Sequence, residues 1–327
     1  MRKRLLSLLL VLACVLTLAV VPVVAAEPDP VQSTASVTEP TPTTDPESSP
    51  EPSSEPSPEP TSEPTSEPTS EPTPEPSPEP SPVPTPSGPW YQAALDFACD
   101  HRILLGDPSG NMMPNDNATR AQMAAMLVRV FGCTAGKDIA HFTDVSTTAW
   151  YYSELSTAAQ MNIFNGYGDG TMGPNRSITR QEAMIVIARA FAVPDGTAAD
   201  IQAFRDASSV GSWAVAKVGG LVKAGIVNGD NGSLHPTASI TRAEIAQMLY
   251  NLGLQFCSDA AALPASGRVI YTGAAPLTAD AFTGTLYLGG PAGRDLGGMN
   301  ITGTLVVRTD PNGTVTVGGT VDTLAVA

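Results

Sequence analysis

An internal repeat constrains the fold of this chain more than any other feature of its 327 residues. Tryptophan occurs only three times, and each tryptophan is followed 16 residues later by a glycine. A proline comes next, and an arginine stands six residues after that proline. The matched positions are Trp90, Gly106, Pro114 and Arg120; Trp150, Gly166, Pro174 and Arg180; and Trp213, Gly229, Pro236 and Arg242. Four landmarks that recur three times predict a tandem-repeat architecture.

Each copy has the pattern of a helix, a loop and a second helix. The first helix is predicted to open at the tryptophan and to stop twelve residues later, at Arg102, Asn162 or Gly225. Asparagine and glycine suit a left-handed helix stop, whereas arginine suits it poorly. The second helix follows a Thr-Arg pair, and its apolar spacing gives one buried face. The predicted core residues are Met123, Met126, Leu127, Val130, Phe131, Ala183, Val186, Ile187, Ala190, Phe191, Ile245, Met248, Leu249 and Leu252.

The Thr-Arg pair raises a question about charge. Thr119, Thr179 and Thr241 each precede a Gln or Glu by three residues, which matches a capping box at the start of the second helix. The capping box does not explain the arginine, because a cation in the first turn opposes the helix dipole. Free N–H groups at a helix N-terminus attract anions, and arginine adds charge-assisted bonds. We therefore predict that the three arginines bind a carboxylate or a phosphate; the alternative is that they are purely structural.

The other landmarks fit a sugar-like ligand. A tryptophan face can stack on a pyranose ring, although each tryptophan could equally be a core anchor at a helix start. The glycine that follows lets backbone approach closely. Replacing Arg180 or Arg242 by alanine is accordingly expected to weaken ligand binding while leaving the fold nearly intact.

Two stretches carry a resemblance to a known family: FTDVSTTAWYYSEL and onward, residues 142–191, and FRDASSVGSWAVAK and onward, residues 204–252. Both are similar to the S-layer homology (SLH) repeat, and residues 90–131 resemble a third copy without the Phe-x-Asp entry. The resemblance implies a mainly α fold in which three helix-loop-helix repeats form a pseudo-threefold bundle. It also implies non-covalent anchoring to a bacterial envelope through secondary cell-wall polysaccharide, often pyruvylated, bound in grooves between neighbouring repeats.

The resemblance assigns roles by position. The three arginines would meet the pyruvate carboxylate, the tryptophans would pack on the sugar, and the glycines would form the groove floor. Asp144 and Asp206 would be the entry aspartates. The first copy departs from this pattern, because it has SPVPTPSGPW where Phe-x-Asp belongs and Gln122 in place of Glu. We therefore expect the grooves to be unequal, with Arg120 contributing least.

The repeats, predicted at 89–136, 140–195 and 202–254, follow two segments of different composition. Residues 1–26 have the basic start, apolar run and small-residue cleavage site of a secretory signal peptide rather than a retained transmembrane helix, so we expect export. Residues 27–88 form a Pro/Glu/Ser/Thr-rich spacer with 13 acidic and no basic side chains, which predicts a disordered, extended tether. Residues 89–327 carry only −5 of the net charge of −15, so the acidity describes the spacer, and nucleic-acid binding is not favoured.

Residues 268–327 change to short β-branched runs separated by Gly-rich turns, which predicts a small β-rich segment, the first rungs of a β-solenoid. A segment of 60 residues has little core of its own, and it could be a cargo module. Outside the signal peptide the cysteines Cys99, Cys133 and Cys257 show no metal-ligand spacing. We predict no metal and no cofactor, and a Cys99–Cys133 disulfide is allowed by export but not required.

The sequence contains no nucleophile elbow, zinc-protease motif or phosphate loop. Its C-terminal aspartates, Asp280, Asp295, Asp310 and Asp322, stand singly in turn-like sequence. We therefore predict a non-catalytic binding module that is secreted to the cell wall or surface layer. The alternative is a structural subunit that assembles with other surface-layer proteins through the β-rich segment; an envelope polysaccharide hydrolase is less favoured.

Overall fold

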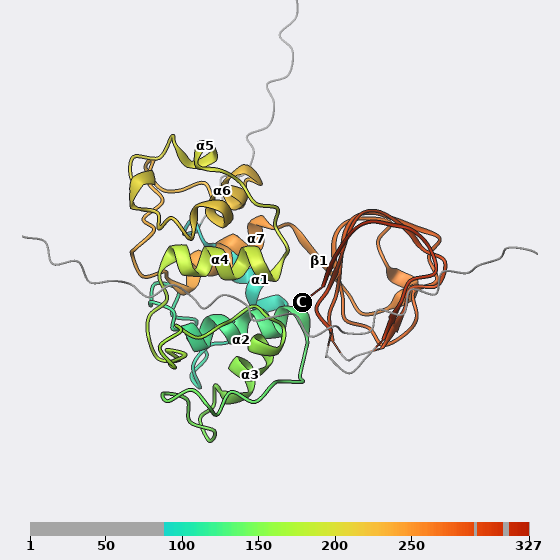
Figure 1. The fold of residues 1–327 in the computed structure, drawn as a ribbon, viewed down its shortest axis with the longest axis horizontal. Helices are drawn as coiled ribbons and strands as arrows, with labels where there is room; N and C mark the ends of the chain where they lie inside the picture. Colours follow the sequence, from blue (N-terminus) through green and yellow to red (C-terminus); the bar gives the residue numbers. More distant parts are fainter. Residues whose placement is uncertain (1–87, 291–292, 310–313, 327) are drawn as a thin grey trace, which may run out of the picture. The chain divides into compact units, whose positions relative to one another are not determined.

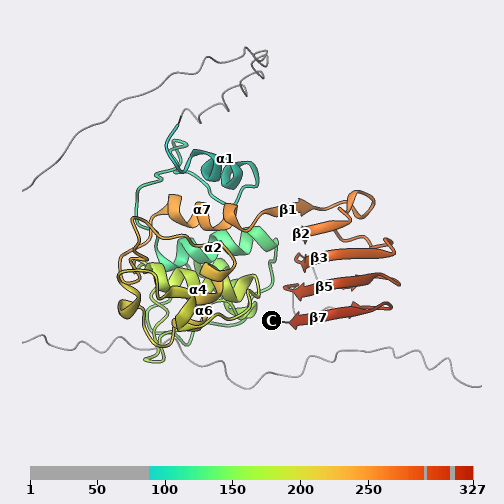
Figure 2. The same cartoon turned by 90° about the horizontal axis from the view of Figure 1, so that it is seen from above.

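The computed structural model describes residues 88–290, 293–309 and 314–326. The predicted signal peptide and all of the predicted spacer except Gly88 lie outside these residues. Within them the chain first forms a helical part and then a coil of parallel strands (Figures 1 and 2). No helix in these three ranges is long and apolar enough to cross a membrane.

The helical part has the predicted order of helix, loop and helix in each copy. Three pairs of longer helices are α1 (Gln92–Asp100) and α2 (Arg120–Phe131), α3 (Tyr152–Gln160) and α4 (Arg180–Ala190), and α6 (Val215–Lys223) and α7 (Arg242–Asn251). A short helix, α5 (Ala198–Ile201), and a 3-10 turn, η1 (Ala207–Ser209), precede the third pair. The second helices begin at the arginines, as predicted.

The start of the first helices was predicted two residues too early. Tyr91, Tyr151 and Ala214 occupy the cap positions, so each tryptophan lies just outside its helix. The predicted stops are correct, since Arg102, Asn162 and Gly225 have positive φ values of 54°, 53° and 69°. Arg102 adopts the left-handed conformation despite its side chain, which shows that the position in the repeat outweighs the local preference.

The apolar stripe of each second helix is buried, as its spacing predicted. The first helix of each copy packs against the second helix of the copy before it: α3 against α2, and α6 against α4. The first copy completes the series, because α1 packs against α7 of the third copy. Each repeat therefore buries its apolar face only with the help of a neighbour, and one core runs through all three.

Three backbone hydrogen bonds join the repeats in a closed ring just before the second helices. The N–H of Ala118 donates to the carbonyl of Ile240 at 2.9 Å, and Ile240 in turn donates to Ile178 at 3.1 Å. The N–H of Ile178 donates to Ala118 at 3.0 Å and closes the ring. The three copies thus contact one another in cyclic order, the third returning to the first.

The β part is a coil of parallel strands with its own core. The strands are β1 (Leu254–Cys257), β2 (Ser266–Tyr271), β3 (Ala281–Leu288), β4 (Arg294–Asp295), β5 (Asn300–Val307), β6 (Val315–Thr316) and β7 (Val321–Val326), with a 3-10 turn, η2 (Ala260–Ala262). One sheet has the order β1-β2-β3-β5-β7, which Figure 2 shows side by side, and β4 pairs with β6. The coil begins earlier than predicted, because β1 lies largely between the boundaries set for the third repeat and the β-rich segment and pairs in register with β2.

The coil also completes the helical core. Ile270, Tyr287 and Val306 belong to the same buried cluster as the repeats. Donors from the coil satisfy carbonyls at the ends of the second helices: Gly290 N–H binds Phe131 O at 2.6 Å, and Tyr287 Oη binds Phe191 O at 3.3 Å. The predicted β-rich segment therefore packs against the repeats and shares their buried core.

Two arginines add hydrogen bonds to this interface at the ends of α4 and α7. Arg308 donates from Nε to Ala190 O at 3.1 Å and from Nη2 to Arg189 O at 2.8 Å, at the end of α4. Arg268 Nη1 donates to Leu252 O at 3.0 Å, beyond the end of α7. Cations at helix C-termini are favoured by the helix dipole. Burial lowers the pKa of Arg308 to about 10, which leaves it charged near neutral pH.

Candidate functional site

The three arginines predicted to bind an anion are buried. Arg120, Arg180 and Arg242 are only 1%, 8% and 5% exposed. Each guanidinium donates from Nε to a carbonyl in the loop of the next repeat: Arg120 to Met172 O at 3.0 Å, Arg180 to Leu234 O at 2.9 Å, and Arg242 to Met112 O at 2.9 Å. The cation at each helix start is therefore explained by a partner in another repeat, which offsets the unfavourable dipole of its own helix.

The starts of the second helices are fully occupied by protein groups. The predicted capping box is present in all three, with Thr119, Thr179 and Thr241 as caps. The first two N–H groups of each helix donate to the loop of the next repeat; in α4, for example, Arg180 N binds Ala238 O and Gln181 N binds Pro236 O, both at 2.9 Å. The premise that these helix starts offer free N–H groups to an anion is therefore wrong, because the neighbouring repeat already satisfies them.

Two of the arginines pair with the acidic residue of the next capping box. Arg180 Nη1 lies 2.7 Å from Glu244 Oε1, and Arg120 Nη1 lies 3.8 Å from Glu182 Oε1. The position that corresponds for Arg242 is Gln122, and no carboxylate of the described residues lies within ion-pair distance of Arg242. Burial lowers the pKa of Arg242. The departure of the first copy at Gln122 thus leaves one buried cation without an ion pair in direct contact, and Asp116 favours its charge only from a longer distance.

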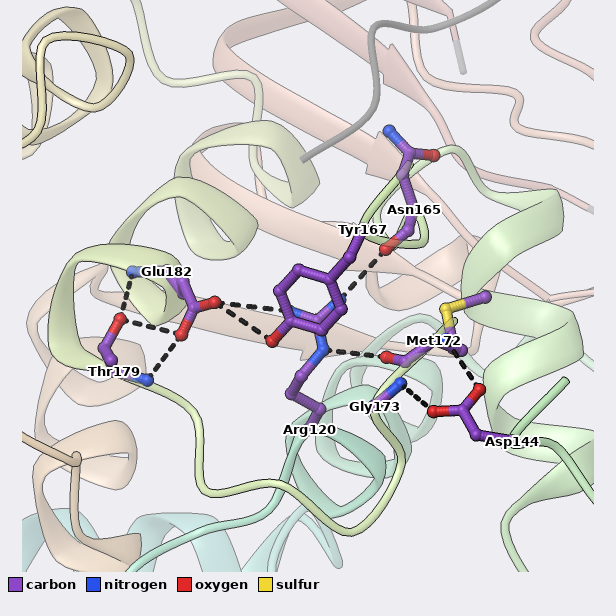
Figure 3. A network of polar contacts seen from close by, with 8 residues as sticks. All are labelled: Arg120, Asp144, Asn165, Tyr167, Met172, Gly173, Thr179 and Glu182. Atoms are coloured by element: carbon purple, nitrogen blue, oxygen red, sulfur yellow. Dashed lines mark hydrogen bonds and ion pairs between the residues drawn. The ribbon is translucent and has the colours of Figure 1, made fainter. Parts of the chain in front are cut away.

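Tyr167 is a member of the site that the sequence analysis did not single out. Its ring lies over the Arg120 guanidinium, with the Arg120 Cζ atom 4.3 Å from the ring centroid, and its hydroxyl donates to Glu182 Oε1 at 3.1 Å (Figure 3). Phe164 contacts the same guanidinium, with its centroid 5.2 Å from Cζ. Burial raises the pKa of Tyr167 to about 12, so it stays a neutral donor. The only signal for it was an aromatic residue directly after Asn165-Gly166.

The entry aspartates hold the loop that receives the arginine. Asp144 accepts hydrogen bonds from the backbone N–H groups of Met172 and Gly173, both at 2.8 Å (Figure 3). Asp206 does the same for Leu234 at 2.8 Å and His235 at 2.7 Å. Burial opposes ionisation of Asp206, but the two N–H donors outweigh it and lower its pKa. Both aspartates therefore bind within their own repeat.

The tryptophans are exposed and do not anchor the core. Trp90, Trp150 and Trp213 have 64%, 59% and 37% of their surface exposed. This excludes the alternative of a core anchor and leaves the ring faces accessible. Trp90 packs edge-on against Tyr91, with ring centroids 5.3 Å apart, and Trp150 packs in the same way on Tyr151 at 5.8 Å. Such contacts orient the indole rings without covering them.

The glycines are required by close approach of the chain to itself. A Cβ atom at Gly166 would lie 2.2 Å from Cε1 of Phe142, and one at Gly229 would lie 2.6 Å from Cε1 of Phe204. At Gly106 the nearest atom would be the carbonyl oxygen of Asn111 at 2.9 Å. All three positions are too crowded for a side chain because of neighbouring atoms of the chain itself, and the role of these glycines at a ligand groove stays a prediction.

One groove brings together a predicted landmark from each repeat. Trp90 of the first, Arg180 of the second and Gly229 of the third line a groove of about 560 Å³. Its other lining residues are Ile226, Val227, Asn228, Asp230, His235, Glu244, Gln247, Met248 and Asn251. An exposed indole, several hydrogen-bonding side chains and a buried cation suit a polar ligand with a ring face.

The expectations on metal sites and on the disulfide concern the His, Cys, Asp and Glu side chains of the described part of the chain. It contains no group of three or more His, Cys, Asp or Glu side chains that could hold a metal ion. Cys99, Cys133 and Cys257 are not disulfide-bonded, so the disulfide that export allowed does not form.

Comparison with known proteins identifies the repeats. The S-layer homology domain family matches residues 85–124, 141–184 and 203–246. The chain is 32% identical over 158 residues to a surface-layer 125 kDa protein of Lysinibacillus sphaericus, an alignment that covers 47% of this chain and 13% of that protein. It is 31% identical over 156 residues to a cellulosome-anchoring protein of Acetivibrio thermocellus, covering 45% and 34%.

The similarity reaches proteins of different activities through one shared region. An amylopullulanase of Thermoanaerobacterium thermosulfurigenes is 30% identical over 167 residues, which are 50% of this chain and only 9% of that enzyme. All these alignments cover well under two thirds of the relative. Each alignment is about as long as the three repeats together. The family match confirms the resemblance noted from the Phe-x-Asp and Thr-Arg motifs. The chain therefore carries three tandem S-layer homology domains.

Proposed function

We propose that this chain attaches non-covalently to the bacterial cell envelope, after export, by binding an anionic polysaccharide of the wall. The proposed ligand carries an acid group such as a pyruvate ketal, and the proposed location is the cell wall or surface layer. The observation that carries the proposal is the groove lined by Trp90, Arg180 and Gly229, one from each repeat. The anchoring and surface-layer names of the relatives support the same direction.

The proposed architecture is a pseudo-threefold bundle with a groove between each pair of neighbours. The closed ring of hydrogen bonds through Ala118, Ile178 and Ile240 supports it. So does the cyclic pairing of each arginine with the loop of the next repeat. Cyclic relation of the described groove predicts two more, one with Trp150, Arg242 and Gly106 and one with Trp213, Arg120 and Gly166.

In the groove, Trp90 would stack on a sugar ring, and the amides of Gln247 and Asn251 would bind hydroxyl groups. Arg180 would act mainly through its charge, because its Nε and Nη1 already bind Leu234 and Glu244. This assigns the arginine two roles, namely fixing the loop that forms the groove floor and attracting the acid group of the ligand.

The proposed function is binding without catalysis. In the coil, Asp295 accepts the N–H of Gly297 at 2.9 Å and Asp322 accepts the N–H of Gly303 at 2.9 Å, so both are engaged in turns and strand edges. The coil does favour one second candidate function, assembly with further surface-layer proteins. Leu324 and Val326 of β7 are exposed, and among the described strands only β5 pairs with β7. Concentration-dependent sedimentation of the chain tests this second function.

Co-sedimentation with purified bacterial walls tests the main proposal. The chain should pellet with native walls and remain in solution after the non-peptidoglycan polymer is removed. Trp90→Ala should weaken binding by roughly 2- to 12-fold, from a stacking contribution of about 0.5–1.5 kcal/mol, with an unchanged thermal midpoint because the ring is exposed. Trp150→Ala and Trp213→Ala measure the other two grooves. Equal binding to stripped and native walls would overturn the proposal.

A further inference from the structure

The loop before the proline accepts an arginine from a neighbouring repeat in all three copies, but an aspartate binds its N–H groups in only two of them. In repeats 2 and 3 its last two residues are Met172–Gly173 and Leu234–His235, and their adjacent N–H groups bind one carboxylate, that of Asp144 or Asp206. The corresponding residues of repeat 1 are Met112 and Met113. Within the described residues, no acceptor binds the N–H of either.

The loop of repeat 1 nevertheless keeps the carboxylate-binding geometry. Met113 has φ = 48°, close to the 52° of His235 and the 67° of Gly173. A positive φ is unfavourable for a side chain like that of methionine by about 1–2 kcal/mol, so other contacts must impose it. Two do: Met112 O accepts Arg242 Nε at 2.9 Å, and Pro114 O accepts the N–H of Ala243 at 2.9 Å. Contacts from repeat 3 thus fix the orientation of the two N–H groups.

The guanidinium beside these two N–H groups has no carboxylate in direct contact. Arg242 is 5% exposed, has no carboxylate within ion-pair distance among the described residues, and makes no hydrogen bond from Nη1 there. Asp116 favours its charged form only from a longer distance. The nearby Asp107 is engaged elsewhere, because it accepts the N–H groups of Ser109 and Asn111, both at 2.9 Å. A pair of converging N–H groups beside a buried cation is a concavity that favours an anion.

We propose that the N–H groups of Met112 and Met113 form a carboxylate-binding site, filled by a group from outside the three repeats as Asp144 and Asp206 fill the other two. The ligand class is a carboxylate, since that is what the two matched loops bind. We favour an acidic sugar as the source of this carboxylate, and that choice rests on the proposed function. The existence of the site does not rest on it. The acidic side chains of residues 27–88 are the competing source.

Amide chemical shifts of the full chain, labelled with ¹⁵N, test this site. Sodium acetate and sodium glucuronate are the probes; sodium chloride at equal ionic strength and glucose are the controls. The amides of Met112 and Met113 should shift saturably with both carboxylates and with neither control. Those of Leu234 and His235 should not respond, because Asp206 occupies them. In Asp206→Ala these two should begin to respond, which makes repeat 3 an internal positive control.

A second chain, with the acidic residues of 27–88 changed to Asn and Gln, separates the two sources. A response in the native chain supports a ligand in trans. If the Met112 and Met113 amides shift only in the neutralised chain, the site exists, but its carboxylate comes from residues 27–88 of the chain itself. Silence in both, while Asp206→Ala responds, would overturn the site. Wall co-sedimentation of Trp90→Ala is read separately, so failure of the proposed function is distinguishable.

Discussion

Repeats 1 and 3 form the same loop from different contacts. In repeat 3, Leu234 and His235 lie between the guanidinium of Arg180 and the carboxylate of Asp206. In repeat 1, the corresponding Met112 accepts only the arginine of the previous repeat in the cycle. The left-handed turn survives without the aspartate. The arginine and the helix start of the neighbouring repeat are therefore sufficient for the loop, and the aspartate adds to them.

The largest expected effect is the loss of an arginine. Arg180→Ala removes the ion pair with Glu244 and leaves Leu234 O without its donor. We expect the free energy of unfolding to fall by about 2–4 kcal/mol, because a buried charged hydrogen bond and a partly buried ion pair are both lost. Denaturant unfolding of the two chains measures it. This replaces the expectation that the alanine variants would leave the fold intact.

Arg242→Ala is the matched comparison for this change. It removes the same Nε contact and, in place of the ion pair, the hydrogen bond from Nη2 to Leu105 O at 2.7 Å. Its loss should be at least as large as that of Arg180→Ala, because a charged hydrogen bond contributes about 1.5–3 kcal/mol and a partly exposed ion pair about 0.5–1 kcal/mol. A smaller loss in Arg242→Ala than in Arg180→Ala would show that the ion pair with Glu244 contributes more to stability than the hydrogen bond to Leu105.

The sequence predicted what each repeat does within itself. The apolar spacing gave the buried face of the second helices, and the Thr-x-x-Glu pattern gave the capping boxes, because both depend on residues close in the chain. The landmark spacing also identified Gly229 and Trp90, which the groove brings together.

The partners of the arginines could not be predicted in the same way. Arg120 and Arg242 bind backbone carbonyls 52 and 130 residues away, and a carbonyl has no signature in the sequence. Their burial was missed for this reason. The start of the coil was missed because β1 is only four residues long and is defined by its pairing with β2.

A smaller effect is expected from removal of the aspartate in repeat 3. Asp206→Ala leaves two N–H groups without an acceptor, and we expect a loss of about 1–3 kcal/mol at neutral pH. Asp280→Ala is the control, because its exposed carboxylate makes no hydrogen bond with the described residues. A loss near zero for Asp206→Ala would mean that the loop is as stable alone as it is in repeat 1.

The pH dependence of this contribution has a defined sign. The pKa of Asp206 is lowered from 3.8, despite partial burial, by its N–H donors. The contribution is therefore complete above about pH 3.8 and disappears as the pH falls through the lower, folded-state pKa. Thermal midpoints of the native chain and Asp206→Ala should converge in acid; a constant difference would exclude the ionised carboxylate as the cause.

The smallest effect, and the most specific for the comparison, is the gain from giving Arg242 a counterion. In Gln122→Glu the new carboxylate would stand where Glu244 stands for Arg180 and where Glu182 stands for Arg120. Gln122 already accepts the N–H of Thr119 at 3.0 Å, so the capping box should be retained. An acid in the first turn also suits the helix dipole. We expect a stabilisation of about 0.5–1.5 kcal/mol.

The dependence of this stabilisation on Arg242 is measured by repeating Gln122→Glu in Arg242→Ala. There the contribution of the ion pair should vanish, and only that of the helix dipole should remain. Weaker binding of acetate at Met112 and Met113 should accompany the gain, because the buried cation is then neutralised from within the protein. A gain that persists unchanged in Arg242→Ala would mean that Gln122 and Arg242 are not coupled, and that repeat 1 differs from the others only in its missing aspartate.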